Sequence, residues 1–115
     1  MSKRDVFLLL EDMRESANKI KDYTLGLSFD DFQYDEKTKD AVIRNFEIIG
    51  EAANRVNRDF QYTHSQLPWD RIRGFRNRIV HEYFGIDYLI VWTIIENDLE
   101  KLIEQIDQVL LKKGR

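Results

Sequence analysis

Apolar residues along most of the chain recur at intervals of three and four, the spacing that places side chains on one face of an α-helix. The first stripe predicts a helix over roughly residues 3–24, and the second predicts a helix over roughly residues 35–58. Gly26, Ser28 and paired aspartates interrupt the period between them and indicate a turn. The two stripes consist of Val6, Leu9, Leu10, Met13, Ala17 and Ile20, and of Val42, Phe46, Ile49, Ala53 and Val56.

The second half of the chain predicts two more helices. Pro68, the only proline, suits the first turn of a helix, and the third helix is expected from there to about Glu82. Gly85 permits a turn and Asp87 can cap the fourth helix, which is expected to run to about Leu111. The apolar stripe of that helix is Leu89, Trp92, Ile95, Leu99, Leu102, Ile103, Ile106 and Leu110.

The predicted fold is all-α, a four-to-five-helix antiparallel bundle that forms a single domain over residues 1–115. No alternating strand pattern, internal repeat or low-complexity tract occurs, and the connections are short enough for antiparallel neighbours. Because the third helix is short, some apolar surface is left for a partner chain to cover, so a homodimer is expected.

Composition narrows the cellular context and the kind of partner. The chain has no cysteine, which excludes disulfides and thiolate metal sites and favours a reducing cytoplasm. Its first apolar run is short and meets acidic residues at once, so neither a signal peptide nor a membrane span is expected. A net charge of -3 argues against nucleic-acid binding through general electrostatics, although it leaves room for a local basic patch.

Such a patch occurs in "RIRGFRNRIVHEYFG", residues 71–85, which holds four arginines. Glycine-rich phosphate loops and the common hydrolase motifs are missing from the chain, and no cofactor is expected. Only two histidines exist, and His64 lies in a polar loop where a surface role is expected. No metal site is expected at His81, because the adjacent Glu82 would lie on a different helix face.

Helical geometry decides which polar residues of this segment could meet. Asn77 and His81 are four residues apart and Arg76 and Tyr83 are seven apart, so each pair would share a helix face. Arg76 and His81 would differ by about 140° in an unbroken helix. They could converge if the last helical turn tightened or unwound, or if a second chain supplied the partner residue.

These side chains suit RNA cleavage without a metal ion. A neutral His81 could take the proton of a ribose 2′-hydroxyl while Arg76 stabilises the charge that grows on the phosphate. Asn77 could orient the imidazole or the phosphate through hydrogen bonds. The RNA backbone would be drawn in by a cationic surface formed by Arg71, Arg73 and Arg78.

A structural explanation of the same residues stays open beside the catalytic one. Arginines on a helix are commonly a solvated face, and a histidine near a helix C-terminus is a favourable charge–dipole arrangement. Gly74 within a helix indicates a close approach of backbone, which packing against another helix explains as well as a ligand does.

The segment "RNRIVHEY" resembles the R-x4-H-x-Y signature of HEPN-domain proteins, in particular the HepT toxin branch of the HEPN/MNT toxin–antitoxin systems. The resemblance extends over essentially the whole chain, including "IIGEAANRV", "LPWDRIRGFRN" and "YFGIDYLIVW". It implies a metal-independent endoribonuclease, the toxin of a type VII system, acting as a homodimer. Arg76 and His81 of both subunits would line a composite cleft, with Asn77 as the polar residue of the motif.

The resemblance also implies a regulatory partner, a minimal nucleotidyltransferase (MNT) antitoxin that transfers AMP from ATP to the tyrosine at position 83. Because Tyr83 would share a face with Arg76, phosphates added there would occupy the cationic pocket and exclude RNA. From the residues alone, Tyr83 could equally be an aromatic that closes the helix end against the core.

Two other functions remain open at the level of the sequence. The chain could be a non-catalytic helical subunit that binds nucleotide or RNA for a two-component nucleotidyltransferase. It could also be a purely structural interaction protein, which amphipathic helices alone would allow.

Overall fold

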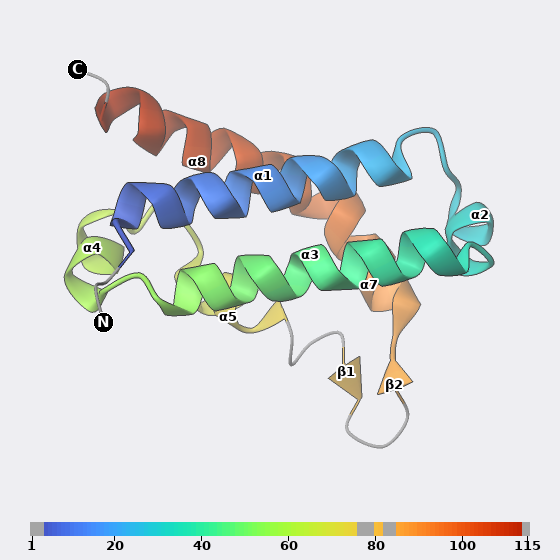
Figure 1. The fold of residues 1–115 in the computed structure, drawn as a ribbon. Coiled ribbons are helices and arrows are strands. Elements are labelled where there is room, and N and C mark those ends of the chain that lie inside the picture. Colours follow the sequence, from blue (N-terminus) through green and yellow to red (C-terminus); the bar gives the residue numbers. More distant parts are fainter. Residues whose placement is uncertain (1–3, 76–79, 82–84, 114–115) are drawn as a thin grey trace.

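The protein is mostly helical, and the computed structural model describes residues 4–75, 80–81 and 85–113. The described elements are α1 (Val6–Thr24), α2 (Phe29–Gln33), α3 (Glu36–Asn54), α4 (Arg58–Thr63), α5 (Trp69–Arg73), β1 (Val80–His81), β2 (Gly85–Ile86), α7 (Tyr88–Asn97) and α8 (Leu99–Lys113). The long helices α1 and α3 lie antiparallel and side by side, and α8 runs back along α1 (Figure 1). The predicted antiparallel helical architecture is therefore confirmed.

The core lies between α1 and its neighbours α3 and α8, and α2, α5 and α7 add buried residues to it. The predicted stripes of the first two helices are buried in full except for Val6, which is partly buried and packs against the core. Residues shielded almost completely from solvent come from most parts of the chain and include Leu10, Met13, Ile20, Phe32, Phe46, Ile49, Ile72, Ile94 and Ile106. Burial of this apolar surface supplies the main driving force for folding.

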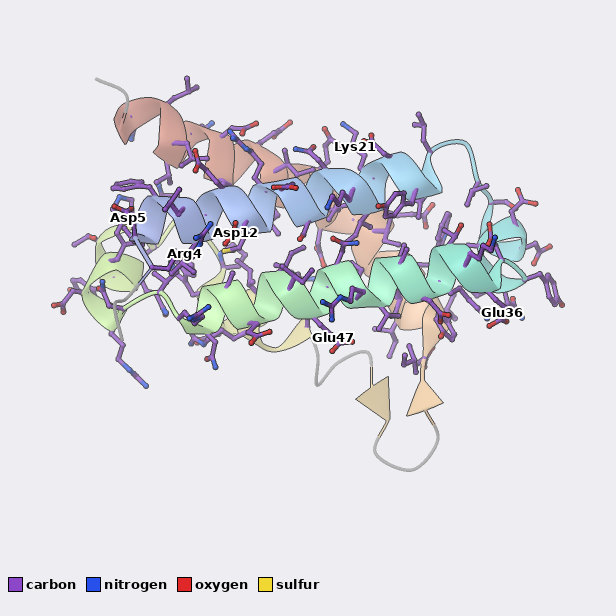
Figure 2. All side chains as sticks on the ribbon, in the orientation of Figure 1. Arg4, Asp5, Asp12, Lys21, Glu36 and Glu47 are labelled. Atoms are coloured by element: carbon purple, nitrogen blue, oxygen red, sulfur yellow. The ribbon has the colours of Figure 1, made fainter. Side chains whose placement is uncertain are left out.

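Polar contacts define the helix ends and the seam between α1 and α8. Asp5, Asp35 and Asp87 accept backbone N–H groups at the starts of α1, α3 and α7, so the predicted cap at Asp87 is confirmed. Just before α1, Arg4 donates both to Oδ1 and to Oδ2 of Asp12, which lies on α1 (Figure 2). Two ion pairs, Arg14 with Asp107 at 3.1 Å and Lys21 with Glu100 at 3.0 Å, join α1 to α8.

The predicted fourth helix is broken into two. α7 ends at Asn97, Asp98 caps it, and α8 begins at Leu99. The break changes the phase of the apolar stripe, so Leu89, which was predicted to be buried, is 59% exposed. The buried residues of α7 are Val91, Ile94 and Trp92, of which Trp92 belongs to the predicted stripe.

The prediction of a third helix continuing to about Glu82 is wrong. α5 spans only Trp69–Arg73, and Gly74 caps its end with φ of −81°. Further along, Val80–His81 form a strand, antiparallel to β2. β-branched and aromatic residues around position 80 favour extended backbone, and Gly85 has φ of +82°, a conformation that suits glycine.

The short helix α5 packs directly on α3. A Cβ atom placed on Gly50 of α3 would lie 3.7 Å from the carbonyl oxygen of Ile72, so the small residue lets the two backbones approach closely. Gly74 has a different role from the one predicted, because its close neighbours are carbonyl oxygens of α5 itself, that of Asp70 at 3.1 Å from such a Cβ.

Among the described residues, no helix combines the length and apolarity needed to cross a membrane.

Candidate functional site

The residues predicted to carry chemistry lie in α5, which holds Arg71 and Arg73, and in the chain between α5 and α7. Of these, His81 lies in β1, while Arg76, Asn77, Arg78 and Tyr83 fall outside the described residues. Because β1 is extended, the helical-face pairing predicted for Asn77 with His81 does not apply at the His81 end. The backbone is extended at Val80 and His81. The position of Arg76 relative to His81 lies outside the described residues, so their convergence stays a prediction.

The β-hairpin fixes the backbone position of His81. Val80 pairs with Ile86, and His81 pairs with Gly85 in the antiparallel register. Ile86 is partly buried against the core, and the next residue, Asp87, caps α7 by accepting the N–H groups of Leu89 and Ile90. The hairpin projects away from the long helices, and β2 leads directly into the start of α7 (Figure 1).

The other end of the segment is anchored by apolar contacts. Ile72 is fully buried, and the ring of Phe75 packs edge to face against Phe46 of α3, with the ring centroids 5.6 Å apart. Since Phe75 directly precedes Arg76, the core holds the chain at the point where the motif begins.

Arg71 of α5 forms an ion pair with Asp98 at the α7/α8 break, with Nη2 2.9 Å from Oδ2. The Asp98 side chain is only 19% exposed, whereas that of Arg71 is 52% exposed. A charge-assisted hydrogen bond to a carboxylate that is largely shielded from solvent is stronger than a neutral hydrogen bond. This contact connects the helix before the motif to the helices after it.

Arg73 is also engaged, because it donates to the carboxylate of Asp70 and to the side-chain oxygen of Gln61 on α4. The sequence places no acid between residues 71 and 78, yet in space Arg71 and Arg73 each meet a carboxylate. A phosphate that binds either arginine would therefore either displace the carboxylate from the guanidinium or bind the guanidinium beside that carboxylate.

A pocket of about 290 Å³ opens between α5 and the α7/α8 break, and we call it the α5–α8 pocket. Its apolar side is formed by Ile72, Phe75 and Leu102, each of which is at most 3% exposed. Polar side chains surround the opening: Arg71, Asn97, Asp98, Lys101 and Gln105. Gln105 donates to the carbonyl oxygen of Gln66, which also lines the pocket, at 2.7 Å.

A second, wider groove of about 720 Å³ lies on the other side of α5, against α4. Arg58 and Tyr62, one helical turn apart on α4, line it together with Arg73. Tyr62 is 85% exposed. The groove is shallow and open to solvent, so it offers less enclosure than the α5–α8 pocket.

His64 is more integrated than the predicted surface histidine. Its ring stacks on Phe60 with the centroids 3.9 Å apart, and Nδ1 lies 3.0 Å from the Phe60 carbonyl oxygen. That oxygen can only accept, so Nδ1 carries the proton in this contact. The His64 carbonyl accepts the indole N–H of Trp69 at 2.9 Å, and the residue therefore joins the end of α4 to α5.

Within residues 4–75, 80–81 and 85–113, no group of three or more His, Asp or Glu side chains is arranged to hold a metal ion. The resolved pKa shift among the described residues is at Asp35, far from the motif in sequence. The pKa of Asp35 is lowered, first by a hydrogen bond from the Thr38 hydroxyl and then by one from the Thr38 backbone N–H.

Sequence reasoning missed the residues that α7 and α8 contribute to the α5–α8 pocket. Lys101 and Gln105 are four residues apart and share one side of α8, while Asn97 is the last residue of α7 before the break. That spacing was visible in the sequence, but the polar side of an amphipathic helix normally faces solvent. Only the packing of α5 across it turns this side into the wall of a pocket.

Comparison with known proteins gives a consistent result over most of the chain. The protein family described as "Ribonuclease HepT-like" matches residues 13–109. "Putative RNase MJ1380" of Methanocaldococcus jannaschii is 40% identical over 109 residues, which cover 95% of this chain and 100% of the relative. "Probable ribonuclease HepT" of Thermococcus cleftensis is 39% identical over 93 residues, covering 81% of this chain and 84% of the relative. No solved structure matches the chain.

Proposed function

The chain belongs to the ribonuclease HepT-like family, and from that premise we propose that it is an endoribonuclease that cleaves RNA without a metal ion. The observation that carries the proposal is the extent of the family match, which runs from within α1 to within α8 and includes the complete motif Arg76, Asn77, His81 and Tyr83. The relatives named above bear ribonuclease names and align over most of their length.

In the proposed reaction the RNA supplies its own nucleophile. His81 accepts the proton of a ribose 2′-hydroxyl, and the 2′-oxygen bonds to the adjacent phosphorus. The bond from phosphorus to the 5′-oxygen breaks, and that oxygen takes a proton from an acid or from water. The products are a 2′,3′-cyclic phosphate and a 5′-hydroxyl, so atoms and charge balance without a cofactor.

Arg76 would stabilise the negative charge that develops on the phosphate oxygens, and Asn77 would orient the imidazole or the phosphate. Arg71, Arg73 and Arg78 would attract the RNA backbone. The 52% exposure of Arg71 supports this role, because its guanidinium can meet a phosphate on its solvent side while it stays bonded to Asp98.

The biological setting that we propose is a type VII toxin–antitoxin system, with this chain as the toxin. It would act as a homodimer in which Arg76 and His81 of both subunits line one cleft. A cognate MNT nucleotidyltransferase antitoxin would neutralise it by transferring AMP to Tyr83. The added phosphates would bring negative charge next to the motif arginines and exclude the RNA backbone.

The test is cleavage of single-stranded RNA in EDTA by protein whose intact mass shows no adduct, compared with His81→Ala prepared in the same way. We expect the substitution to lower the rate about 100-fold to 10,000-fold, the usual range for loss of a general base. His64→Ala is the matched control, since His64 is the other histidine and stacks on Phe60 away from the motif. It should retain cleavage.

Binding measurements separate catalysis from binding alone. If His81→Ala loses cleavage but keeps its RNA affinity, the residue acts in the chemical step. If adduct-free protein does not cleave RNA at all, or if affinity and cleavage fall together, the chain is a binding subunit that presents nucleotide or RNA to a nucleotidyltransferase.

A further inference from the structure

The α5–α8 pocket is a partly open site, and Arg71 is the one residue of its lining that has a role in the proposed mechanism. Its apolar side is almost completely shielded from solvent, yet its polar lining includes two cationic side chains, a carboxylate and the amides of Asn97 and Gln105. Arg71 of α5, Asn97 of α7 and Lys101 of α8 line the same cavity. Polar groups that converge around an apolar cavity are typical of a small-molecule site.

The size and chemistry of the pocket fit a single nucleotide. Its volume of about 290 Å³ is at the lower end of ligand pockets, which generally range from about 300 to 1,000 Å³. A nucleobase has an apolar face that can lie against Ile72 and Leu102, and a polar edge that the exposed amide of Asn97 can read. The ammonium of Lys101 and the guanidinium of Arg71 can receive the phosphate.

The position of the pocket connects it to the motif. Phe75 lies on its apolar side and is followed directly by Arg76. The Arg71–Asp98 ion pair at its opening holds together the two helical regions that flank the motif segment. A nucleotide bound here would be close along the chain to the residue proposed to stabilise the reacting phosphate.

We propose that the α5–α8 pocket binds one nucleotide next to the phosphate that is cleaved, and so positions the RNA strand for reaction. This inference rests on the proposed ribonuclease function for its RNA substrate. The ligand chemistry is a nucleobase with an attached phosphate. It could be provided by a nucleotide within a strand or by a free mononucleotide, and the experiment distinguishes these sources.

The experiment is photo-crosslinking of the full chain to a short 2′-fluoro RNA that contains 4-thiouridine. The fluoro substitution removes the attacking hydroxyl, so the readout does not depend on cleavage. Crosslinked peptides are identified by mass spectrometry, and affinity is measured in parallel by fluorescence anisotropy. We expect crosslinks in the two parts of the chain that line the pocket, residues 65–75 and 97–105.

A matched pair of substitutions tests the charged opening. Lys101→Glu reverses a charge at the pocket, and we expect it to weaken RNA binding about tenfold. Lys112→Glu makes the same change on the same helix about 16 Å further along its axis, and it should change affinity less than about twofold. Both lysines are exposed, so neither substitution disturbs the core.

Crosslinks that fall only outside the two segments would overturn the proposal, as would an equal loss of affinity in the two lysine variants. Pocket crosslinks in a protein that fails to cleave ordinary RNA would refute the ribonuclease function alone. Cleavage without pocket crosslinks would refute the pocket alone. If free 4-thiouridine 5′-monophosphate crosslinks to the same peptides, the pocket binds a free nucleotide. If only the RNA crosslinks there, the pocket binds a nucleotide within a strand.

Discussion

The bundle of α1, α3 and α8 and the edge formed by α4, α5 and the β-hairpin are built in different ways. Each long helix buries a continuous apolar stripe in the core. Two exposed ion pairs between α1 and α8 add to this packing at the surface. At the edge, α4 buries no residue completely, and α5 and the hairpin are each only a few residues long. There, side-chain hydrogen bonds and ion pairs make many of the connections between elements.

The two regions therefore have different tasks: the bundle stabilises the fold, and the edge carries the polar groups proposed for function. The bundle can supply the free energy of folding through burial, so the edge is free to expose arginines and to form a pocket. The two regions meet at a few apolar contacts, among them the ring contact of Phe46 with Phe75 and the approach of Gly50 to Ile72. Substitutions at these contacts should reveal how strongly the edge depends on the bundle.

The largest effect on stability is expected from Phe46→Ala, which removes a side chain 1% exposed and leaves a cavity. It should lower the free energy of unfolding by about 3–5 kcal/mol, measured by urea denaturation. The matched control is Tyr62→Ala on α4, where the aromatic side chain is 85% exposed, and it should change stability by less than about 0.5 kcal/mol. Similar losses from both substitutions would mean that the edge contributes to stability as much as the bundle.

A smaller effect is expected at the contact of α3 with α5. Gly50→Leu would push against the backbone at Ile72 and should cost about 1–3 kcal/mol while reducing RNA cleavage, because α5 leads into the motif. Gly50→Ala is the control, since its Cβ would meet the Ile72 carbonyl oxygen at an ordinary 3.7 Å. The alanine should stabilise the protein by up to about 1 kcal/mol through its higher helix propensity. If Gly50→Ala destabilised the protein, α3 and the Ile72 carbonyl oxygen would lie closer together than the structure shows.

The smallest effect concerns the cap of α3, within the bundle. Hydrogen bonds from Thr38 lower the pKa of Asp35, so the ionised carboxylate stabilises the fold above its unfolded-state pKa, and this contribution is lost as pH falls through the folded-state value. The unfolding free energy of wild-type protein should therefore decrease more steeply below about pH 4 than that of Asp35→Asn. Thr38→Val keeps the carboxylate but removes the hydroxyl donor, and it should give an intermediate slope in urea titrations. Parallel curves for all three would contradict the role of this cap.

The long helices could be predicted from the sequence because Leu9, Met13, Phe46 and Ile49 repeat with a helical period that burial then satisfies. The strand at His81 could not, since two paired residues are too short to leave a periodic signal. The chemistry of the side chains drew attention to Arg76, Asn77 and His81, and the resemblance to a family then implied their roles in a motif with Tyr83. The ion pair between Arg71 and Asp98 joins residues 27 positions apart (98 − 71 = 27), and no local pattern indicates it.

The composition of α4 has a consequence for the rates at which backbone amides exchange with deuterium. Since no residue of α4 is fully buried, opening this helix exposes little apolar surface and should require only a fraction of the free energy of global unfolding. Amides in the centres of α1 and α3 should exchange only when the whole domain unfolds. The indole bond of Trp69 to the His64 carbonyl would then mark where local opening of α4 ends and the cooperative unit begins.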